Sequence, residues 1–199
     1  MGRKSKAKER RLEILSHFYE VIIEEGFEGA SIAKIAEKMS VNPSLLIHYF
    51  KTKDAMIEGL IEHIINTYSS HILPDFSKVE DPKERWEDVL DVVSRIQWGT
   101  FLNTTVFYSA YTLSLRDPGV KNKFTELYEK VVGQLQDEIA HAEQANIIQV
   151  KDTRQAAELV MTLIEGSNFY QNVSHNGVDI DKRSRMIKET ITLMTDNNI

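Results

Sequence analysis

Apolar residues recur at intervals of three and four along almost the whole chain, the spacing of one face of an α-helix. The first such stretch carries Leu12, Leu15, Tyr19, Ile22 and Ile23. The 199 residues include only 9 Gly and 4 Pro, few for a β-rich fold, which needs a turn about every 8–12 residues. The sequence therefore predicts an all-α fold.

Capping residues predict where the first helices begin and end. The first helix, from about residue 8, is expected to stop at Gly26, which can take the left-handed conformation past a helix end. Ser31 is an expected N-cap of a short second helix. Asn42 caps a third, with Pro43 at its first position, where the missing N–H of proline costs nothing.

About six more helices follow, the first capped by Thr52 and ended by Pro74. The others are expected over residues 83–97, 101–115, 120–144, 153–174 and 180–196, with a break near Asn146. We predict two domains: residues 1–52, with a helix-turn-helix over 31–50, and a helical body over 53–199.

Charge is distributed unevenly over this acidic chain. The net charge is −6, yet residues 1–54 carry a net +2, and a basic arm containing Arg3, Lys4 and Lys6 opens the sequence. Such asymmetry favours a basic contact surface on an acidic body. The alternative is a solubilising tail.

Several classes of protein are disfavoured. The chain has no Cys, which excludes disulfides and thiol catalysis and fits a reducing cytoplasm. No run approaches the ~18 apolar residues of a membrane span, and no leader is evident. The six histidines have no metal-ligand spacing. We therefore expect a cytoplasmic protein with no metal, no cofactor, no membrane contact and no enzymatic activity.

The segment from Ser31 to Phe50 predicts a DNA-binding helix pair. Ile35, Ala36, Val41, Leu46 and Phe50 are expected to form its core. Because Leu46 and Phe50 share the inward face of the third helix, the N-terminal half of that helix is free to meet base edges. The expected base contacts are Pro43, Ser44, Leu45, Ile47 and His48. Leu45 or Ile47 could instead be buried against the fourth helix.

Other residues are expected to contact DNA phosphates. The candidates are Arg3, Lys4, Lys6, Ser31, Lys34, Tyr49, Lys51 and Lys53. Ser31 and Lys53 lie at helix N-termini, which favour anions. Lys34 opposes the helix dipole in a first turn, a cost that a nearby phosphate would offset.

Residues 8–60 resemble the N-terminal domain of TetR-type transcriptional regulators, whose pattern is close to T-x-x-x-I-A-x-x-x-G-V-S-x-x-x-L-Y-x-Y-F-x-x-K. This chain carries Ser31, Ile35-Ala36, Ser40-Val41-Asn42, Leu46-Ile47, Tyr49-Phe50 and Lys53 at those offsets. It departs at Ser40, where the family has glycine, and at Ile47, where it has tyrosine. The resemblance implies a homodimer that binds a palindromic operator, usually as a repressor released by a small molecule.

The helical body supplies candidate ligand and dimer residues. A pocket for a hydrophobic or amphipathic effector is expected among Trp98, Phe101, Thr105, Tyr108, Tyr111, Tyr128, Met161 and Phe169; the alternative is an ordinary core. A dimeric four-helix bundle is expected through Leu159, Leu163, Gly166, Ile187, Ile191 and Met194. The alternative is that the last two helices complete the chain's own core.

Two other functions stay open. The chain could be a DNA-binding adaptor or architectural protein whose body recruits a protein partner, which a tightly packed body without a cavity would favour. It could also be an all-helical lipid carrier or enzyme, which would bind DNA with no sequence preference and little salt dependence. The sequence does not identify the operator, the effector or the direction of regulation.

Overall fold

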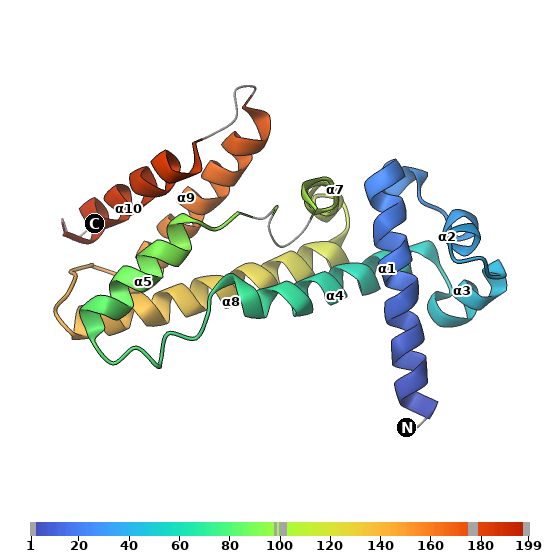
Figure 1. Cartoon of the computed structure of the whole chain (residues 1–199), viewed down its shortest axis with the longest axis horizontal. Coiled ribbons are helices and arrows are strands. Elements are labelled where there is room, and N and C mark those ends of the chain that lie inside the picture. The colour runs from blue at the N-terminus through green and yellow to red at the C-terminus, as the bar shows by residue number, and fades with distance from the viewer. Residues whose placement is uncertain (1–2, 98, 100–102, 175–178, 197–199) are drawn as a thin grey trace. The chain divides into compact units, whose positions relative to one another are not determined.

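The computed structural model of the chain describes residues 3–97, 99, 103–174 and 179–196, without the side chains of residues 3–5, 67–71 and 196 (Figure 1). All regular elements in these ranges are helices, nine in number, which confirms the predicted all-α fold. The helices pack into two units. Unit 1 comprises Met1–Tyr68 and Trp98–Glu126, and unit 2 comprises Ser69–Gln97 and Leu127–Ile199. The predicted functional division at residues 52 and 53 stays a prediction.

Unit 1 holds the helix-turn-helix. Its helices are α1 (Arg3–Gly29), α2 (Ile32–Lys38), α3 (Pro43–Phe50), most of α4 (Lys53–Ile72), α7 (Thr104–Ser114) and the start of α8 (Pro118–Gln144). In this unit α1 packs against α2 and α7, and α2 packs against α3 (Figure 1). The backbone N–H of Asn103 donates to the Tyr19 hydroxyl at 2.8 Å, which joins the start of α7 to α1.

The apolar residues that predicted the helix α1 do not all lie on its buried face. Leu15 and Ile22 of that set are buried, together with Phe18. Leu12 and Ile23 are 37% and 40% exposed. Helical spacing predicts the helix but does not by itself select the face that is buried. Packing against the neighbouring helices of unit 1 determines which face of α1 is buried.

The ends of α1 also differ from the prediction. The helix begins at Arg3 rather than at about residue 8. At Gly26 the backbone leaves the helical region, with φ 72° and ψ 172°, a combination open only to glycine. The predicted break is therefore confirmed, although one further turn follows it as far as Gly29.

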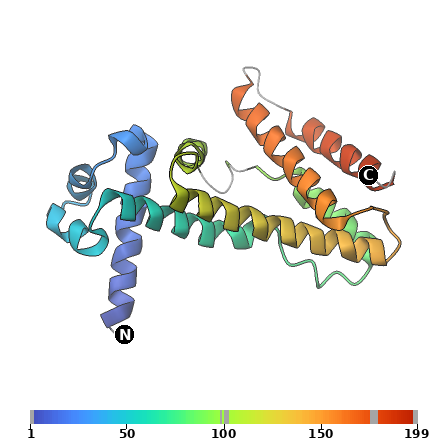
Figure 2. The same cartoon turned by 180° about the vertical axis from the view of Figure 1, so that it is seen from behind.

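Unit 2 is a helical body. It contains α5 (Pro82–Ser94), the remainder of α8, α9 (Thr153–Val173), α10 (Ile180–Asp196) and the end of α4. Figures 1 and 2 both show α10 lying against α9, and α10 also packs against α5. Leu135 and Ile139 on α8 are buried together with Ile164 and Ile191. These two residues of α8, four positions apart, thus belong to the core of this unit.

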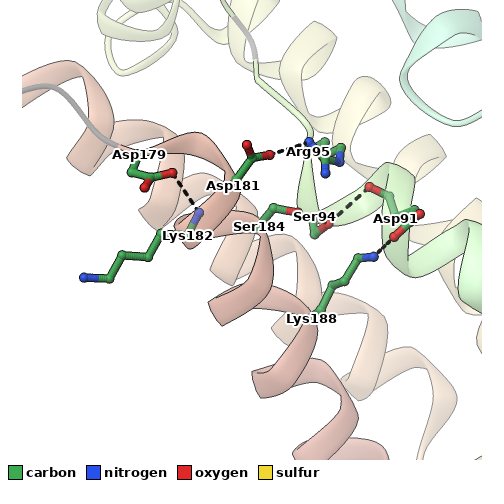
Figure 3. Close-up of polar contacts among 8 residues, drawn as sticks. All are labelled: Asp91, Ser94, Arg95, Asp179, Asp181, Lys182, Ser184 and Lys188. Atoms are coloured by element: carbon green, nitrogen blue, oxygen red, sulfur yellow. Dashed lines mark hydrogen bonds and ion pairs between the residues drawn. The ribbon is translucent and has the colours of Figure 1, made fainter.

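Polar contacts hold α10 against α5 (Figure 3). The hydroxyls of Ser94 and Ser184 share a buried hydrogen bond of 2.7 Å. Arg95 Nη1 donates to Asp181 at 3.1 Å, and Lys188 pairs with Asp91. Each of these residues thereby has its polar partner within unit 2.

Two helix boundaries were predicted wrongly. The first helix of unit 2, α5, stops at Ser94, short of residue 97. Helix α8 begins at Pro118 rather than at about residue 120, because proline fits the first helical turn and the Asp117 carboxylate accepts the Val120 N–H at 3.0 Å. In the described residues, no helix is both long and apolar enough to cross a membrane.

Candidate DNA-binding site

The turn between α2 and α3 contains a serine in a left-handed conformation. Ser40 has φ 54°. The N–H of Val41 donates to the Ala36 carbonyl and the N–H of Ser40 to the Glu37 carbonyl, both at 2.9 Å. These two bonds form a Schellman motif with Ser40 at the position where glycine is usual. The chain therefore keeps the family's turn and accepts the backbone strain that glycine would avoid.

The start of α3 is fixed by its cap. The Asn42 side chain accepts the Ser44 N–H at 2.9 Å, and Pro43 occupies the first turn. Both features confirm the predicted start of the helix. Pro43, Ser44 and His48 are exposed, so they are free to meet a partner.

The two apolar candidates for base contact have different surroundings. Ile47 is 48% exposed, whereas Leu45 is half-buried. Leu46 and Phe50, 0% and 2% exposed, form the inward face of α3 as predicted. Ile47 is thus open to a partner on this short helix, and its contact with bases stays a prediction.

An arginine of α1 anchors the C-terminal end of α3. Arg11 Nη1 donates to the Tyr49 carbonyl at 2.6 Å, one of the terminal carbonyls that a helix leaves unpaired. The same guanidinium stacks over the Phe50 ring, 4.1 Å from its centroid. Sequence analysis did not single out Arg11. Its positioning role was missed because Tyr49 lies 38 residues away in the chain.

Two predicted phosphate contacts already have partners in unit 1. Lys34 forms an ion pair with Glu25, so the cation in the first turn of α2 has a countercharge without DNA. Lys53 Nζ lies 3.4 Å from the Glu28 carbonyl. Neither interaction is buried, so both ammonium groups remain within reach of a phosphate.

The remaining candidates are less constrained. Lys6 and Lys51 are exposed, with no acceptor for either ammonium group among the described residues. Tyr49 is half-buried, its ring edge-on to His48 at 5.3 Å. The hydroxyl of Ser31 caps α2, accepting the Lys34 N–H at 3.3 Å. The side chains of Arg3 and Lys4 lie outside the described part of the chain.

A neighbouring lysine has carboxylate partners of its own. Lys38 Nζ lies 2.7 Å from Glu24 and 3.4 Å from Glu20. The hydrogen bond to Glu24 raises the pKa of Lys38 above its usual value of 10.5. Because Lys38 is engaged by two acidic residues of α1, it links α2 to α1.

The matches to family models decide which family this helix pair represents. A model described as bacterial regulatory proteins of the tetR family matches residues 14–60, and one described as a tetracyclin repressor-like C-terminal domain matches residues 83–195. The second match alone covers more than half of the chain. The chain belongs to the TetR family.

Relatives of this TetR-family chain are distant. The nucleoid occlusion factor SlmA of Haemophilus influenzae is 32% identical over 91 residues, 45% of this chain and 42% of that protein. The chain thus matches less than half the length of that relative. The HTH-type transcriptional regulator PksA of Bacillus subtilis is 24% identical over 183 residues, 92% of this chain and 88% of that protein.

A solved structure has the same fold. A transcriptional regulator of Saccharomonospora viridis, crystallised with choline, superposes with a TM-score of 0.78 and 15% identity, covering 92% of this chain and 96% of that one. An identity this low shows shared architecture alone. The fold is therefore that of TetR-family regulators, an N-terminal helix-turn-helix domain followed by a helical C-terminal domain.

The predicted ligand residues of the TetR-family chain fall in both units. Trp98 and Phe101 lie outside the described residues. In unit 1, Tyr111 is 45% exposed and meets Phe124 edge-on at 6.3 Å, while Tyr108 is half-buried and Thr105 exposed.

In unit 2, Tyr128 is half-buried and Met161 is buried. Phe169 is 58% exposed. Because the predicted set is divided between two units that are described separately, its role as one pocket stays a prediction.

The predicted dimer residues differ in exposure. Ile187 and Ile191 are 8% and 1% exposed and pack in the core of unit 2. Their contact with a second copy stays a prediction. Leu159 is 37% exposed, Gly166 is exposed, and Leu163 and Met194 are half-buried.

Proposed function

We propose that this TetR-family chain is a sequence-specific DNA-binding repressor that acts by binding rather than catalysis, as a homodimer in the cytoplasm. Its operator is palindromic, and a small hydrophobic or amphipathic ligand releases it. The exposed N-terminal half of α3 carries the proposal, because caps, turn and Arg11 fix the helix while leaving Ser44, Ile47 and His48 open. Two such helices would enter major grooves about 34–36 Å apart.

Selection of bound fragments from random double-stranded DNA tests this proposal. Half-sites should recur with two-fold symmetry at a spacing near one helical turn. Ile47→Ser should relax the preference at one A·T position by about 1–3 kcal/mol while leaving the others intact, because it removes a contact with a thymine methyl. An unchanged preference would show that Ile47 does not read bases.

Salt dependence separates phosphate contacts from other effects of charge. Lys51→Gln should reduce the slope of log affinity against log salt by about 0.9, the value for one phosphate contact, without changing sequence preference. Lys78→Gln, a change of the same charge at an exposed position of unit 2, is the matched control and should leave the slope unchanged. Equal effects of both variants would argue against a contact at Lys51.

The ion pair between Lys34 and Glu25 makes a sharper test possible. If Lys34 contacts phosphate, Lys34→Gln weakens DNA binding and Glu25→Gln, which frees the lysine, strengthens it. If the pair only joins α1 to α2, both variants lower stability slightly and leave operator affinity unchanged. One binding assay therefore distinguishes the two roles. The affinities of the two variants change in opposite directions if Lys34 contacts phosphate, and neither changes if the pair only joins α1 to α2.

The homodimer is supported by apolar side chains exposed on the last two helices. Tyr170 and Val173 on α9 are 65% and 55% exposed, and Met186 and Leu193 on α10 are 57% and 62% exposed. A monomer seldom leaves so many large apolar groups in water on adjacent helices. Sedimentation equilibrium should find a dimer, and Leu193→Lys should shift it toward the monomer.

Release by a ligand follows from linkage. A ligand and DNA that favour different conformations must weaken each other's binding by the same factor. Small molecules that raise the unfolding temperature should therefore be tested for an equal effect on operator affinity. Choline, found with the Saccharomonospora viridis regulator, is a reasonable first compound.

One observation favours a second candidate, a DNA-binding adaptor that recruits a protein partner. The apolar void between Trp86, Leu135 and Ile191 measures about 10 Å³, too small for any ligand, so α5, α8 and α10 pack closely at this point of unit 2. If no small molecule alters operator affinity while DNA binding is intact, the adaptor is the better proposal.

A further inference from the structure

A groove between α9 and α10 of unit 2 has an unsatisfied arginine in its wall. The groove has a volume of about 720 Å³ and is lined by Leu163, Gly166, Tyr170, Met186 and Arg183, among others. Arg183 is only 6% exposed. Its Nη1 donates to Gln171, but Nε and Nη2 are buried with no hydrogen-bond partner in the described structure.

The two unsatisfied nitrogens form one edge of the guanidinium, the edge that binds carboxylates side-on. Elsewhere in unit 2, a carboxylate binds the same edge of another arginine. Arg85 donates from Nε and Nη2 to the two carboxylate oxygens of Glu138, at 2.7 and 2.8 Å. Arg183 lines the α9–α10 groove, and the same donor pair has no acceptor in the described structure, so this guanidinium retains the hydrogen-bonding capacity for one bidentate carboxylate.

In the same chain, the acidic residues near the start of α10 have other partners than Arg183 (Figure 3). Asp179 accepts the Lys182 N–H at 3.0 Å and so caps the helix. Asp181 pairs with Arg95 on α5. Leaving a buried cation unpaired costs several kcal/mol, and burial lowers the pKa of Arg183 below its usual value. A carboxylate from outside the chain would remove that cost.

The surroundings of the groove indicate where the carboxylate comes from. Apolar side chains exposed on both helices flank it, including Tyr170 and Met186. A Cβ added at Gly166 would meet nothing within 4 Å, so no described part of the chain packs directly against this glycine. The body is also rich in carboxylates, with a net charge of −8 over residues 55–199. A second copy would bring apolar surface and carboxylates together.

We infer that Arg183 binds a carboxylate of the second copy across the α9–α10 face, which makes this arginine an intersubunit contact of the dimer. The inference rests on the proposed homodimer. In a two-fold interface the same groove faces itself, and the pair occurs twice. Asp179 is the acidic residue among those lining the groove, so the Asp179 carboxylate of the other copy is the first candidate.

The decisive measurement is the dimer dissociation constant of Arg183→Met, obtained by sedimentation equilibrium over a dilution series. Truncating one partner of a buried charge pair costs a few kcal/mol of binding free energy. Because the pair occurs twice in a two-fold dimer, the total cost is doubled. The dimer dissociation constant should therefore rise roughly 10³-fold. The matched control is Arg95→Met, which breaks an exposed pair inside one chain and should leave the constant unchanged. Circular dichroism checks that both variants are folded.

A double-mutant cycle identifies the acid. Asp179→Asn keeps a good helix cap while removing the charge. If it weakens the dimer, and combining it with Arg183→Met adds little more, the two side chains form the pair. Glu165→Gln and Glu189→Gln are tested in the same way. A weakened Arg183→Met dimer in which none of the three acids couples would overturn the pairing.

Other outcomes distinguish a failure of the proposed homodimer from a failure of the Arg183 contact. A wild-type protein that is monomeric at every concentration would refute the proposed homodimer itself. A wild-type dimer whose dissociation constant is unchanged in Arg183→Met would refute the role of Arg183 alone. If sodium acetate or inorganic phosphate raised the unfolding temperature of wild type but not of Arg183→Met, with equal dimer constants, the groove would bind a free anion and the inference would be wrong.

Discussion

Replacing Ser40 by glycine should stabilise the protein. An L-residue in the left-handed conformation costs about 1–2 kcal/mol, and Ser40 has φ 54°. Glycine loses about 0.5–1 kcal/mol more backbone freedom on folding, which offsets part of the gain. Because Ser40 is exposed and its hydroxyl has no partner in the described structure, the substitution removes no packing. The net gain is about 0.5–1 kcal/mol.

Urea and thermal unfolding followed by circular dichroism measure this gain. The midpoint should rise by about 1–4 °C for a chain of this length. Ser16→Gly is the matched control, since Ser16 is exposed within α1; there the same chemical change should cost a few tenths of a kcal/mol or more. If Ser40→Gly proved neutral or as destabilising as Ser16→Gly, the left-handed turn would not be imposed on the folded chain.

Three further predictions concern stability and titration. Gly59→Ala should destabilise unit 1 by about 1 kcal/mol in urea unfolding, because the new Cβ would lie 3.1 Å from Cε1 of Phe50 and overpack the core. Arg11→Met should cost about 1 kcal/mol in the same assay, since it removes the stacked cation and a charged hydrogen bond. Hydrogen bonds from Ser77 hold the pKa of Asp75 below its usual value of 3.8. The stabilisation is therefore present above pH 3.8 and is lost as the pH falls through the lower folded value; in an NMR titration Ser77→Ala should raise the pKa of Asp75.

Matched variants serve as controls for Gly59→Ala and Arg11→Met. A Cβ at Gly133 in α8 would meet nothing within 4 Å, so Gly133→Ala should stabilise by about 0.5–1 kcal/mol. Arg10 makes only an i, i+3 pair with Glu13, so Arg10→Met should cost a few tenths of a kcal/mol. A loss at Gly133, or an equal loss at Arg10 and Arg11, would contradict the packing arguments.

Local signals in the sequence predicted most of the fold. Asn42, Thr52 and Gly26 were expected at helix ends because caps and breaks depend on a few neighbouring residues, and the structure places each there. The start of α8 was expected at about residue 120 instead of Pro118, because proline can end a helix or begin one, and only the Asp117 cap resolves which. The buried face of α1 followed only in part from the sequence, since more apolar residues have helical spacing than that face buries.

For the candidate DNA-binding site, the sequence predicted the helices and their turn, whereas the structure was needed to find the contacts between distant side chains. The turn, the caps and the inward residues of α3 follow from short-range chemistry, and they were sufficient to indicate a TetR-type helix pair. The anchoring of α3 by Arg11 and the pairing of Lys34 with Glu25 join residues far apart in the chain. No periodicity or spacing records such contacts.

By itself, then, the sequence determined that the chain is helical, where its helices are capped and that its N-terminal part is built to bind DNA. These properties depend on hydrogen bonds and apolar patterns within a few residues. Only the tertiary structure decided that Ile187 and Ile191 are core and that Arg183 lies buried with one edge unsatisfied. Burial depends on which helices meet, and that is a property of the packed chain rather than of any segment.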